Sequence, residues 1–325
     1  MRISVAICTW NRAKLLDKTL CEFHSLHIPE GVTWELLVVN NNCTDSTDDV
    51  IARHADRLPL RRLFEPKPGH SNARNCAVAA AAGDLIIWTD DDVLVDPEWL
   101  ASYVSAARRW PDAGYFGGLI SPWYEITPPD WVVANLTRLY GMLVIRDLGE
   151  EERPFSGIEQ PFGANMAFRT DLLRHHRFDP ELGYKGTDIV LGDETALLES
   201  LRSSSIQGVW VPSARVRHYV GSRRLTRSFL WSYFRGEGVT AARMRGVPED
   251  YLKGPTWRGV PRWLRRLTFG LWLEAHYDRL LGRPSWLEKY IRAAHVSGIM
   301  REIRDRKMLD GPRVPERPRE AELTP

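Results

Sequence analysis

The fold is decided by the stretch Gly83-Asp84-Leu85-Ile86-Ile87-Trp88-Thr89-Asp90-Asp91-Asp92, an apolar strand that ends on three consecutive carboxylates. Three like charges at one strand end repel one another, and a divalent cation is the usual way in which such a cluster is neutralised. Aspartate oxygens suit hard ions such as Mg²⁺ or Mn²⁺. Because ligands of open α/β sheets collect at the carboxyl ends of strands, the stretch predicts a metal site there. The alternative is a solvated acidic turn that caps the next helix.

The first hundred residues alternate between predicted strands and predicted helices, which favours a parallel sheet with helices on its faces. The predicted strands are residues 2–8, 34–39, 60–65 and 85–89. Three of them run into polar residues, namely Thr9-Trp10-Asn11, Asn40-Asn41-Asn42 and Asp90-Asp91-Asp92. Since the carboxyl ends of parallel strands lie side by side, we expect these residues at one edge of the sheet. The predicted fold class is therefore α/β, with a Rossmann-like, mostly parallel sheet flanked by helices.

The rest of the chain is less regular. Residues 120–162 are rich in tryptophan, tyrosine and proline, which predicts long loops and short helices over the sheet. Regular structure returns with a predicted strand at 165–169, a helix from Asp193 to Arg202 and a strand that leads to His218. Beyond these, residues 226–309 are predicted as a helical extension and residues 310–325 as a disordered tail.

Charge is distributed unevenly along the chain. Residues 1–214 hold 20 basic and 30 acidic residues, whereas residues 215–325 hold 24 basic and 12 acidic residues. Within the basic part, residues 257–292 interleave arginine with tryptophan and leucine near helical spacing, a composition typical of interfacial helices. We expect an anionic membrane surface as a partner of this segment; the alternative is a helical layer packed on the core.

Two absences bear on location. No apolar run approaches the roughly 18 residues that a membrane span requires, and a strand that begins at residue 2 leaves no room for a signal peptide. We therefore expect a cytoplasmic protein, peripheral on the cytoplasmic face of the membrane if the extension binds lipid.

Six short motifs stand in a recognisable order: Ser4-Val5-Ala6-Ile7-Cys8-Thr9-Trp10-Asn11-Arg12, Val38-Val39-Asn40-Asn41-Asn42-Cys43-Thr44-Asp45, Ala73-Arg74-Asn75, Asp90-Asp91-Asp92, Gly163-Ala164-Asn165 and Gly192-Asp193-Glu194. In this order the chain resembles glycosyltransferase family 2 over residues 3 to about 240. The resemblance implies the GT-A fold in residues 1–225, with a nucleotide-sugar half at about 1–100 and an acceptor half at about 101–225. It also implies inverting transfer from a nucleoside-diphosphate sugar, with a UDP-sugar expected, to a hydroxyl of a glycan, lipid-linked or small-molecule acceptor.

The family's D-x-D motif implies a metal site here. It matches Asp90 and Asp92, so that Asp92 would hold Mn²⁺ or Mg²⁺ while Asp90 approaches the ribose or the donor sugar. Asp91 is expected to turn toward backbone donors. His218 stands where some members of the family supply a histidine to the metal; its alternative role is structural.

The family also implies a general base on the acceptor side. By position Glu194 matches the catalytic residue, with Asp193 as the alternative because the acidic pair is reversed relative to the family's usual Glu-Asp order. A third interpretation is that both carboxylates only favour the helix dipole.

Nucleotide and donor binding is expected at a wider set of matching positions: Thr9, Trp10, Asn11, Asn41, Arg74, Asp90, Asp91 and Asn165. Among them, Trp10 would stack on the base, Asn41 would hydrogen-bond its edge and Arg74 would reach a carbonyl or a phosphate. Aspartates are common in the family at the positions of Asn40 and Asn41, which leaves uracil specificity open. The arginines that follow His218 are either a diphosphate clamp or a solvated basic stretch: Arg223, Arg224 and Arg227.

Two rival functions are less consistent with the sequence. A nucleotidyltransferase would show a glycine-rich phosphate loop with a lysine after the first strand, which Thr9-Trp10-Asn11-Arg12 lacks. A non-catalytic binder of nucleotide sugars or nucleic acid could use the basic extension, but the intact carboxylates Asp90, Asp92 and Glu194 argue against it. No nucleic-acid partner is expected. The family's processive Gln-x-x-Arg-Trp motif is absent from the sequence, which favours the addition of one or a few sugars.

Overall fold

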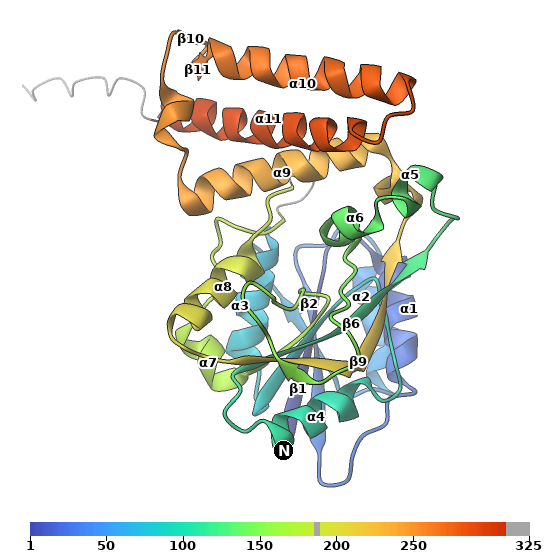
Figure 1. Cartoon of the computed structure of the whole chain (residues 1–325). Coiled ribbons are helices and arrows are strands. Elements are labelled where there is room, and N and C mark those ends of the chain that lie inside the picture. The colour runs from blue at the N-terminus through green and yellow to red at the C-terminus, as the bar shows by residue number, and fades with distance from the viewer. Residues whose placement is uncertain (185–188, 310–325) are drawn as a thin grey trace, which may run out of the picture. The chain divides into compact units, whose positions relative to one another are not determined.

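The structure, a computed structural model, describes residues 1–184 and 189–309 (Figure 1). The chain divides into two compact units, the first from Met1 to Tyr233 and the second from Phe234 onward. The tail predicted to be disordered, residues 310–325, lies outside the described residues.

The N-terminal half of the first unit is a parallel sheet, as predicted. Its four strands lie in the order β3-β2-β1-β4 and pair in parallel. Their bounds are β1 Arg2–Thr9, β2 Thr33–Asn40, β3 Leu60–Phe64 and β4 Leu85–Asp90. The fold class is confirmed: a mixed α/β unit around a large central sheet.

The second half of the sheet departs from the simple parallel pattern. Strand β8 (Asn165–Arg169) is antiparallel to both β4 and β6 (Tyr115–Tyr124). The long strand β9 (Gly208–Val220) then pairs in parallel with β6. Two short strands, β5 (Val93–Val95) and β7 (Arg153–Pro154), are antiparallel to β9.

The prediction of loops over residues 120–162 was wrong at its start, because β6 continues to Tyr124. Gly117, Gly118 and Pro122 interrupt the apolar pattern of this strand. A Cβ on Gly117 would collide with Pro161, and one on Gly118 with the carbonyl oxygen of Ala214, so both glycines permit close packing. Two short helices follow, as predicted: α5 (Asp130–Val133) and α6 (Leu136–Leu143).

Helices cover both faces of the sheet (Figure 1). Because successive strand residues face opposite sides, Ile3, Val5 and Ile7 pack into one core while Ala6 packs into the other. The first core contains side chains of α1 (Ala13–Phe23), α2 (Thr47–Ala55) and α4 (Trp99–Arg109). The second contains those of α3 (His70–Ala80), α7 (Thr170–His175) and α8 (Asp193–Ser203).

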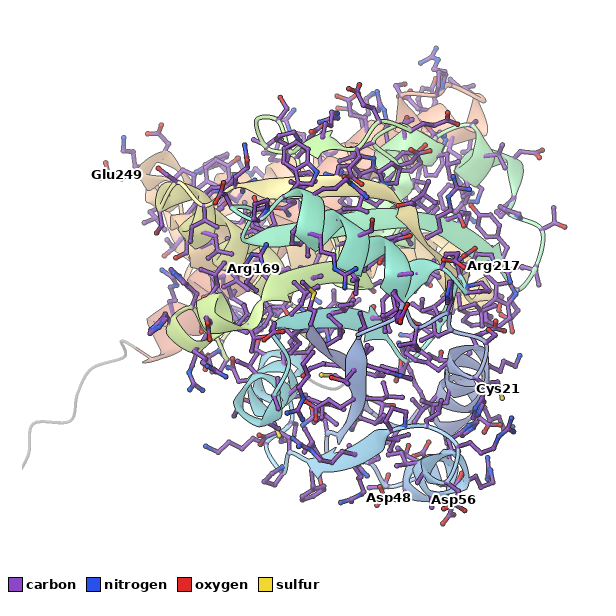
Figure 2. The ribbon with its side chains drawn as sticks, turned by 90° about the horizontal axis from the view of Figure 1, so that it is seen from below. Cys21, Asp48, Asp56, Arg169, Arg217 and Glu249 are labelled. Atoms are coloured by element: carbon purple, nitrogen blue, oxygen red, sulfur yellow. The ribbon has the colours of Figure 1, made fainter. Side chains whose placement is uncertain are left out.

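Helix α4 is anchored at its C-terminal end by an arginine of the sheet. Arg169, labelled in Figure 2 at the end of β8, donates hydrogen bonds to the carbonyl oxygens of Ala107, Trp110 and Ala113. A cation at a helix C-terminus satisfies carbonyls that have no partner within the helix. This contact holds the C-terminal end of α4 against β8, a strand in the interior of the sheet.

The second unit is helical. Helix α9 (Arg227–Arg245) contains the division between the units. It is followed by the 3₁₀ turn η2 (Glu249–Leu252) and by a small hairpin of β10 (Thr256–Trp257) and β11 (Val260–Pro261). Two long helices complete the unit, α10 (Arg262–Leu280) and α11 (Trp286–Leu309). A Cβ on Gly238 would meet the carbonyl oxygen of His295, and one on Gly298 that of Arg235, so the backbones of α9 and α11 touch there. Across the described residues, no helix has the length and apolar content to cross a membrane.

Candidate functional site

The polar strand ends meet at one edge of the sheet, as the sequence predicted. Thr9 at the end of β1 stands opposite Asn40 of β2, and Cys8 stands opposite Asp90 of β4. The loops that follow these strands therefore border one another, and they carry most of the predicted site residues.

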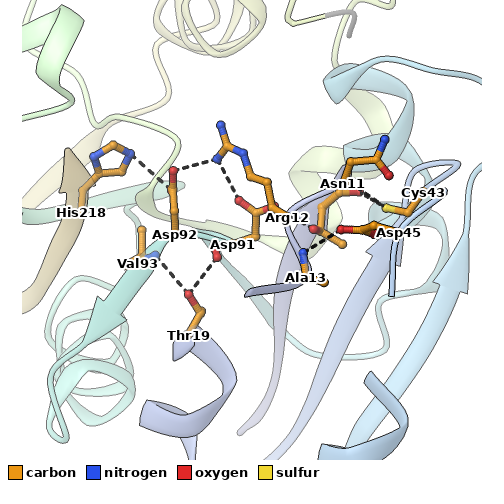
Figure 3. Close-up of polar contacts among 11 residues, drawn as sticks. Asn11, Arg12, Ala13, Thr19, Cys43, Asp45, Asp91, Asp92, Val93 and His218 are labelled. Atoms are coloured by element: carbon orange, nitrogen blue, oxygen red, sulfur yellow. Dashed lines mark hydrogen bonds and ion pairs between the residues drawn. The ribbon is translucent and has the colours of Figure 1, made fainter. Parts of the chain in front are cut away.

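Three predicted metal ligands lie together there. Asp90, Asp92 and His218 each offer a ligand atom, and these atoms all lie within 4.8 Å of one another. His218 reaches the cluster because β9 pairs with β5, which places it opposite Val93. Its Nε2 lies 3.4 Å from Oδ1 of Asp92 (Figure 3).

The donor atoms of this cluster fit a divalent cation. Oδ1 of Asp92 and Nδ1 of His218 are buried and have no hydrogen-bond partner within the described part of the chain. Burial lowers the pKa of His218 to about 4, so the imidazole is neutral at pH 7 and keeps a lone pair. Burial, together with the neighbouring Asp92 charge, raises the pKa of Asp90 to about 6. Carboxylate oxygens suit Mn²⁺ or Mg²⁺, whereas a neutral imidazole is a ligand for transition metals, so the set with His218 fits Mn²⁺ better than Mg²⁺.

Arg12 is a site residue that sequence reasoning missed. Its Nη1 donates to Oδ1 of Asp91 at 3.0 Å and to Oδ2 of Asp92 at 2.7 Å (Figure 3). Burial alone would raise the pKa of Asp92, but the guanidinium of Arg12 helps to hold it below its ordinary value. A signal was available in the sequence, since buried carboxylates need a cation and Arg12 follows the polar end of the first strand.

Asp91 differs from its prediction. Its carboxylate accepts hydrogen bonds from the Thr9 hydroxyl at 2.7 Å and from Arg12, both side-chain donors rather than backbone donors. The Thr19 hydroxyl donates to the carbonyl oxygen of Asp91 and accepts from the amide of Val93 (Figure 3). Thr9 and Asp91 are thus both buried and hydrogen-bonded to each other at the carboxyl ends of β1 and β4.

A second acidic group stands at the start of α8. The buried guanidinium of Arg74 donates to Oδ2 of Asp193 at 2.8 Å and to Oε1 of Glu194 at 2.7 Å. His70 adds a contact, with Nδ1 3.5 Å from Oδ2 of Asp193. Burial alone would raise the pKa of Asp193, but Arg74 and His70 hold it well below its usual range.

The two carboxylates of this pair differ in accessibility. The Asp193 side chain is 6% exposed, and the Glu194 side chain is 26% exposed. Within the described part of the chain, Oε2 of Glu194 makes no hydrogen bond, so it is free to accept a proton. Arg74 itself was predicted to reach a base carbonyl or a phosphate; instead it binds these two carboxylates, and its guanidinium lies over the Phe178 ring.

Gly163 provides the space for this ion pair. A Cβ at this position would collide with Oε1 of Glu194 and Nη2 of Arg74. Glycine is therefore required at this position of the Gly163-Ala164-Asn165 motif, because the Arg74 and Glu194 side chains pack against it.

Asn165, which was predicted to bind the donor, has its polar atoms engaged within the protein. The side chain is fully buried and its amide is saturated. Its oxygen accepts from the Trp99 indole and the Tyr103 hydroxyl, and its nitrogen donates to the carbonyl oxygens of Leu119 and Ala214. Asn165 is a hydrogen-bond hub that joins α4, β6 and β9.

Asn41, predicted to hydrogen-bond the base, is also bonded within the protein. Its amide nitrogen donates to the carbonyl oxygens of Glu65 and Lys67, and its oxygen accepts from the amide of Gly69. These bonds fix the loop between β3 and α3. The need both to donate and to accept explains an amide here, because a carboxylate can only accept.

Other predicted residues lie at the surface of the site. Trp10 is 41% exposed at the end of β1 and is free to stack on a base. Asn11 is exposed and has a left-handed backbone, and its side-chain oxygen accepts from the amide of Thr44. Of the three candidate clamp arginines, Arg224 in the 3₁₀ turn η1 (Ser222–Leu225) is half-buried and close enough to Asp92 and His218 to lower the pKa of both.

The chain matches the model of the family described as "Glycosyl transferase family 2" over residues 4–173. It is 25% identical over 249 residues to the succinoglycan biosynthesis protein ExoM of Rhizobium meliloti (strain 1021), which covers 75% of each chain.

Two solved structures share the fold. A mannosyltransferase from Pyrobaculum calidifontis, PcManGT in complex with GDP-Man and Mn²⁺, aligns with a TM-score of 0.54 at 18% identity, over 95% of this chain and 76% of that one. S. aureus TarS 1–349 in complex with UDP-GlcNAc aligns with a TM-score of 0.52 at 15% identity, over 95% and 92% of the two chains. At these identities the likeness establishes the fold.

Proposed function

The chain belongs to glycosyl transferase family 2, and from that premise we propose that it transfers a sugar, with inversion, from a nucleoside-diphosphate sugar to an acceptor hydroxyl in a metal-dependent reaction. The observation that carries the proposal is the pair of acidic groups in the first unit. Asp90, Asp92 and His218 bring their ligand atoms within 4.8 Å of one another, and Arg74 binds Asp193 and Glu194 at the start of α8. The first group can hold a cation, and the second offers a carboxylate able to act as a base.

The first group would hold the metal through Asp92, Asp90 and His218. A bound Mn²⁺ or Mg²⁺ would supply charge neutralisation for the diphosphate leaving group. The likeness to a fold bound to GDP-Man and Mn²⁺ supports this choice of cation without fixing it. Asp90, the ligand without a hydrogen bond or ion pair in the described part of the chain, is also available to a donor hydroxyl.

On the acceptor side, Glu194 is the proposed general base. Arg74 fixes one of its oxygens, which leaves Oε2 to take the proton of the attacking hydroxyl. Asp193 is the weaker candidate, because it is buried and bound by Arg74 and His70. We assign Asp193 the task of holding Arg74, and through it Glu194, in place.

Other residues would bind the donor without taking part in proton transfer. Trp10 supplies an exposed ring for the base, and Arg224 supplies a cation near Asp92 for the diphosphate. We propose a UDP-sugar as the donor. GDP- and dTDP-sugars are the alternatives to be tested, since the Asn41 amide nitrogen is engaged by the loop that carries Glu65 and Lys67.

The acceptor is proposed to be a glycan carried on lipid, and the enzyme to be a cytoplasmic protein that binds peripherally to an anionic membrane through residues 257–292. A soluble glycan or a small molecule is the competing class of acceptor. The choice of a lipid-linked acceptor rests on the basic, aromatic character of the second unit, because the described residues of the first unit do not indicate an acceptor class.

The test is release of nucleoside diphosphate from a panel of UDP-, GDP- and dTDP-sugars, with Mn²⁺ and with a chelator. Slow donor hydrolysis requires no knowledge of the acceptor. Metal-dependent release from one nucleotide class would support the proposal and name the donor. A folded protein that binds a nucleotide sugar but releases no diphosphate from it, with or without metal, would favour the non-catalytic binder.

A further inference from the structure

Helix α10 has two apolar faces, and only one of them is packed. Leu264 and Ala275 are buried, and Leu264 joins a core with Val296, Ile299 and Ile303 of α11, which lies beside α10 (Figure 1). The opposite face carries large apolar side chains in solvent. They recur every three or four residues, the spacing of one helix face, and comprise Phe269, Trp272, Leu273, Tyr277 and Leu280.

The exposure of this outward face is large for a surface helix. Phe269 is 61% exposed and Leu280 is 80% exposed. Single exposed leucines are ordinary, but a contiguous row of them with aromatic residues marks a surface that meets an apolar environment. Phe269 and Trp272 stack on each other with ring centroids 6.3 Å apart. We call the five side chains of this face the apolar strip.

Charge on α10 is segregated in a way that favours anions at the rim of this strip. Arg262 and Arg266 lie before the strip in the first turns of α10, Arg279 lies in its last turn, and Arg283 follows the helix. The two acidic residues of the helix are engaged by cations, Glu274 by Lys289 of α11 and Asp278 by both Lys289 and Arg283. The outward strip is therefore flanked by cations and carries no carboxylate of its own helix.

The neighbouring hairpin extends the same chemistry. Trp257 is exposed, and the guanidinium groups of Arg258 and Arg265 lie 5.2 and 4.7 Å from the centre of its ring. At the far end of the helix, Arg283 lies 5.9 Å from the ring of Tyr277. Aromatic rings paired with arginine are suited to the boundary between lipid headgroups and acyl chains, where the rings enter the apolar layer and the cations stay at the phosphates.

We propose that this outward face of α10, with Trp257, is a docking surface for an anionic lipid bilayer, on which the helix lies in the plane of the interface. The acceptor class then follows: an acceptor carried on lipid would reach the enzyme at this surface. That last step rests on the proposed function, whereas lipid binding does not.

A second copy of the chain fits the face less well. Pairing two such helices antiparallel brings Arg262 and Arg266 of one copy toward Arg279 and Arg283 of the other, and parallel pairing brings each arginine toward itself. Both arrangements oppose like charges with no acidic partner on the strip. Nucleic acid would use the arginines but would leave Phe269, Leu273 and Leu280 in water.

The test is co-sedimentation of the full chain with vesicles of phosphatidylcholine alone and of phosphatidylcholine mixed with phosphatidylglycerol. We expect binding to the anionic vesicles, which Leu273→Asp abolishes because it places a carboxylate in the centre of the strip. Ile158→Asp is the matched control, since Ile158 is an exposed apolar residue of the first unit and should leave binding unchanged. Arg262→Gln and Arg266→Gln should each weaken binding about fivefold, whereas Arg57→Gln, at an exposed site on the first unit, should not.

The vesicle experiment distinguishes a lipid-binding surface from an interface with a second copy of the chain. Failure of the folded wild type to bind anionic vesicles at low salt, equal binding to both vesicle types, or full binding by Leu273→Asp would each overturn the lipid surface. A wild-type dimer that Leu273→Asp makes monomeric, without lipid binding, would assign the face to a second copy. Nucleotide-sugar turnover measured without vesicles reports on the sugar-transfer reaction alone, so lipid binding and the proposed reaction can each fail while the other stands.

Discussion

Arg12 and Asp92 form an ion pair of 2.7 Å at the centre of the predicted metal site. The arginine binds Oδ2 of Asp92, while Oδ1 of the same carboxylate faces His218. One side of Asp92 is thus occupied by a cation of the protein, and the other is available to a metal. Arg12 also neutralises Asp91, so it balances buried charge when no metal is bound.

Removing Arg12 should therefore change stability and metal affinity in opposite directions. Arg12→Gln leaves two buried carboxylates without their cation, and we expect a loss of roughly 1 to 2 kcal/mol in the metal-free protein. This is less than for a fully buried pair because the Arg12 side chain is 44% exposed. Mn²⁺ should then raise the melting temperature more in the variant than in the wild type. Equal stability of the two metal-free proteins, or a smaller Mn²⁺ effect in the variant, would contradict this role.

Gly163→Ala tests the support of Glu194. The new methyl group would occupy the space of the Arg74–Glu194 ion pair, so we expect transfer activity to fall at least tenfold while Mn²⁺ and nucleotide binding persist. Gly270→Ala is the control, because Gly270 is a helical glycine with no atom near its added Cβ, and it should keep full activity. Wild-type turnover in Gly163→Ala would show that the ion pair is not needed.

Asn41→Asp tests the loop between β3 and α3. An aspartate cannot donate to the carbonyl oxygens of Glu65 and Lys67 and would face them with negative charge, so we expect a loss of about 1 to 3 kcal/mol. Urea unfolding measures the loss, and hydrogen exchange should quicken at the amide of Gly69, whose acceptor is Asn41. If Asn41 instead reads the base, the variant would keep its stability and lose nucleotide affinity.

Glu237 in α9 gives a pH dependence to the stability of the second unit. Burial raises its pKa from 4.5 to about 7. The folded state therefore holds a proton that the unfolded state releases between these values, and stability falls as pH rises through that window. Glu237→Gln removes this pH dependence of the free energy of unfolding, which amounts to at most about 3 kcal/mol. The melting temperatures of the two proteins should be equal near pH 4, and that of the variant should be higher at pH 8. A difference in melting temperature that does not change with pH would refute this.

The sequence predicted the elements whose signal is local. The strand that ends at Asp90, the acidic start of α8 and the polar ends of β1 and β2 were all visible as patterns, and the parallel register brings those strand ends together. By contrast, β5 has only three residues, and β6 contains two glycines and a proline, so neither shows the apolar alternation of a strand. Their place is set by pairing with the distant strand β9.

Within the site, the sequence predicted the positions of the residues better than their roles. Thr9, Asn41 and Asn165 were assigned to the donor, yet each spends its hydrogen bonds inside the protein. A polar side chain in a family motif can serve a ligand or a buried turn, and only the geometry of its partners separates the two. Arg12 and His70 were missed for the converse reason, because their partners lie far away in the sequence.

The most direct test of the central claim is calorimetric titration of UDP, and in parallel GDP, into wild type, Asp92→Asn and Glu194→Gln with Mn²⁺ present. The account predicts that one nucleotide binds wild type and Glu194→Gln alike, that Asp92→Asn binds at least tenfold more weakly, and that Glu194→Gln lowers turnover by about 10²- to 10⁴-fold. Nucleotide binding that is equal in Asp92→Asn and wild type, or unchanged when Mn²⁺ is chelated, would contradict a metal-dependent transferase site at Asp92.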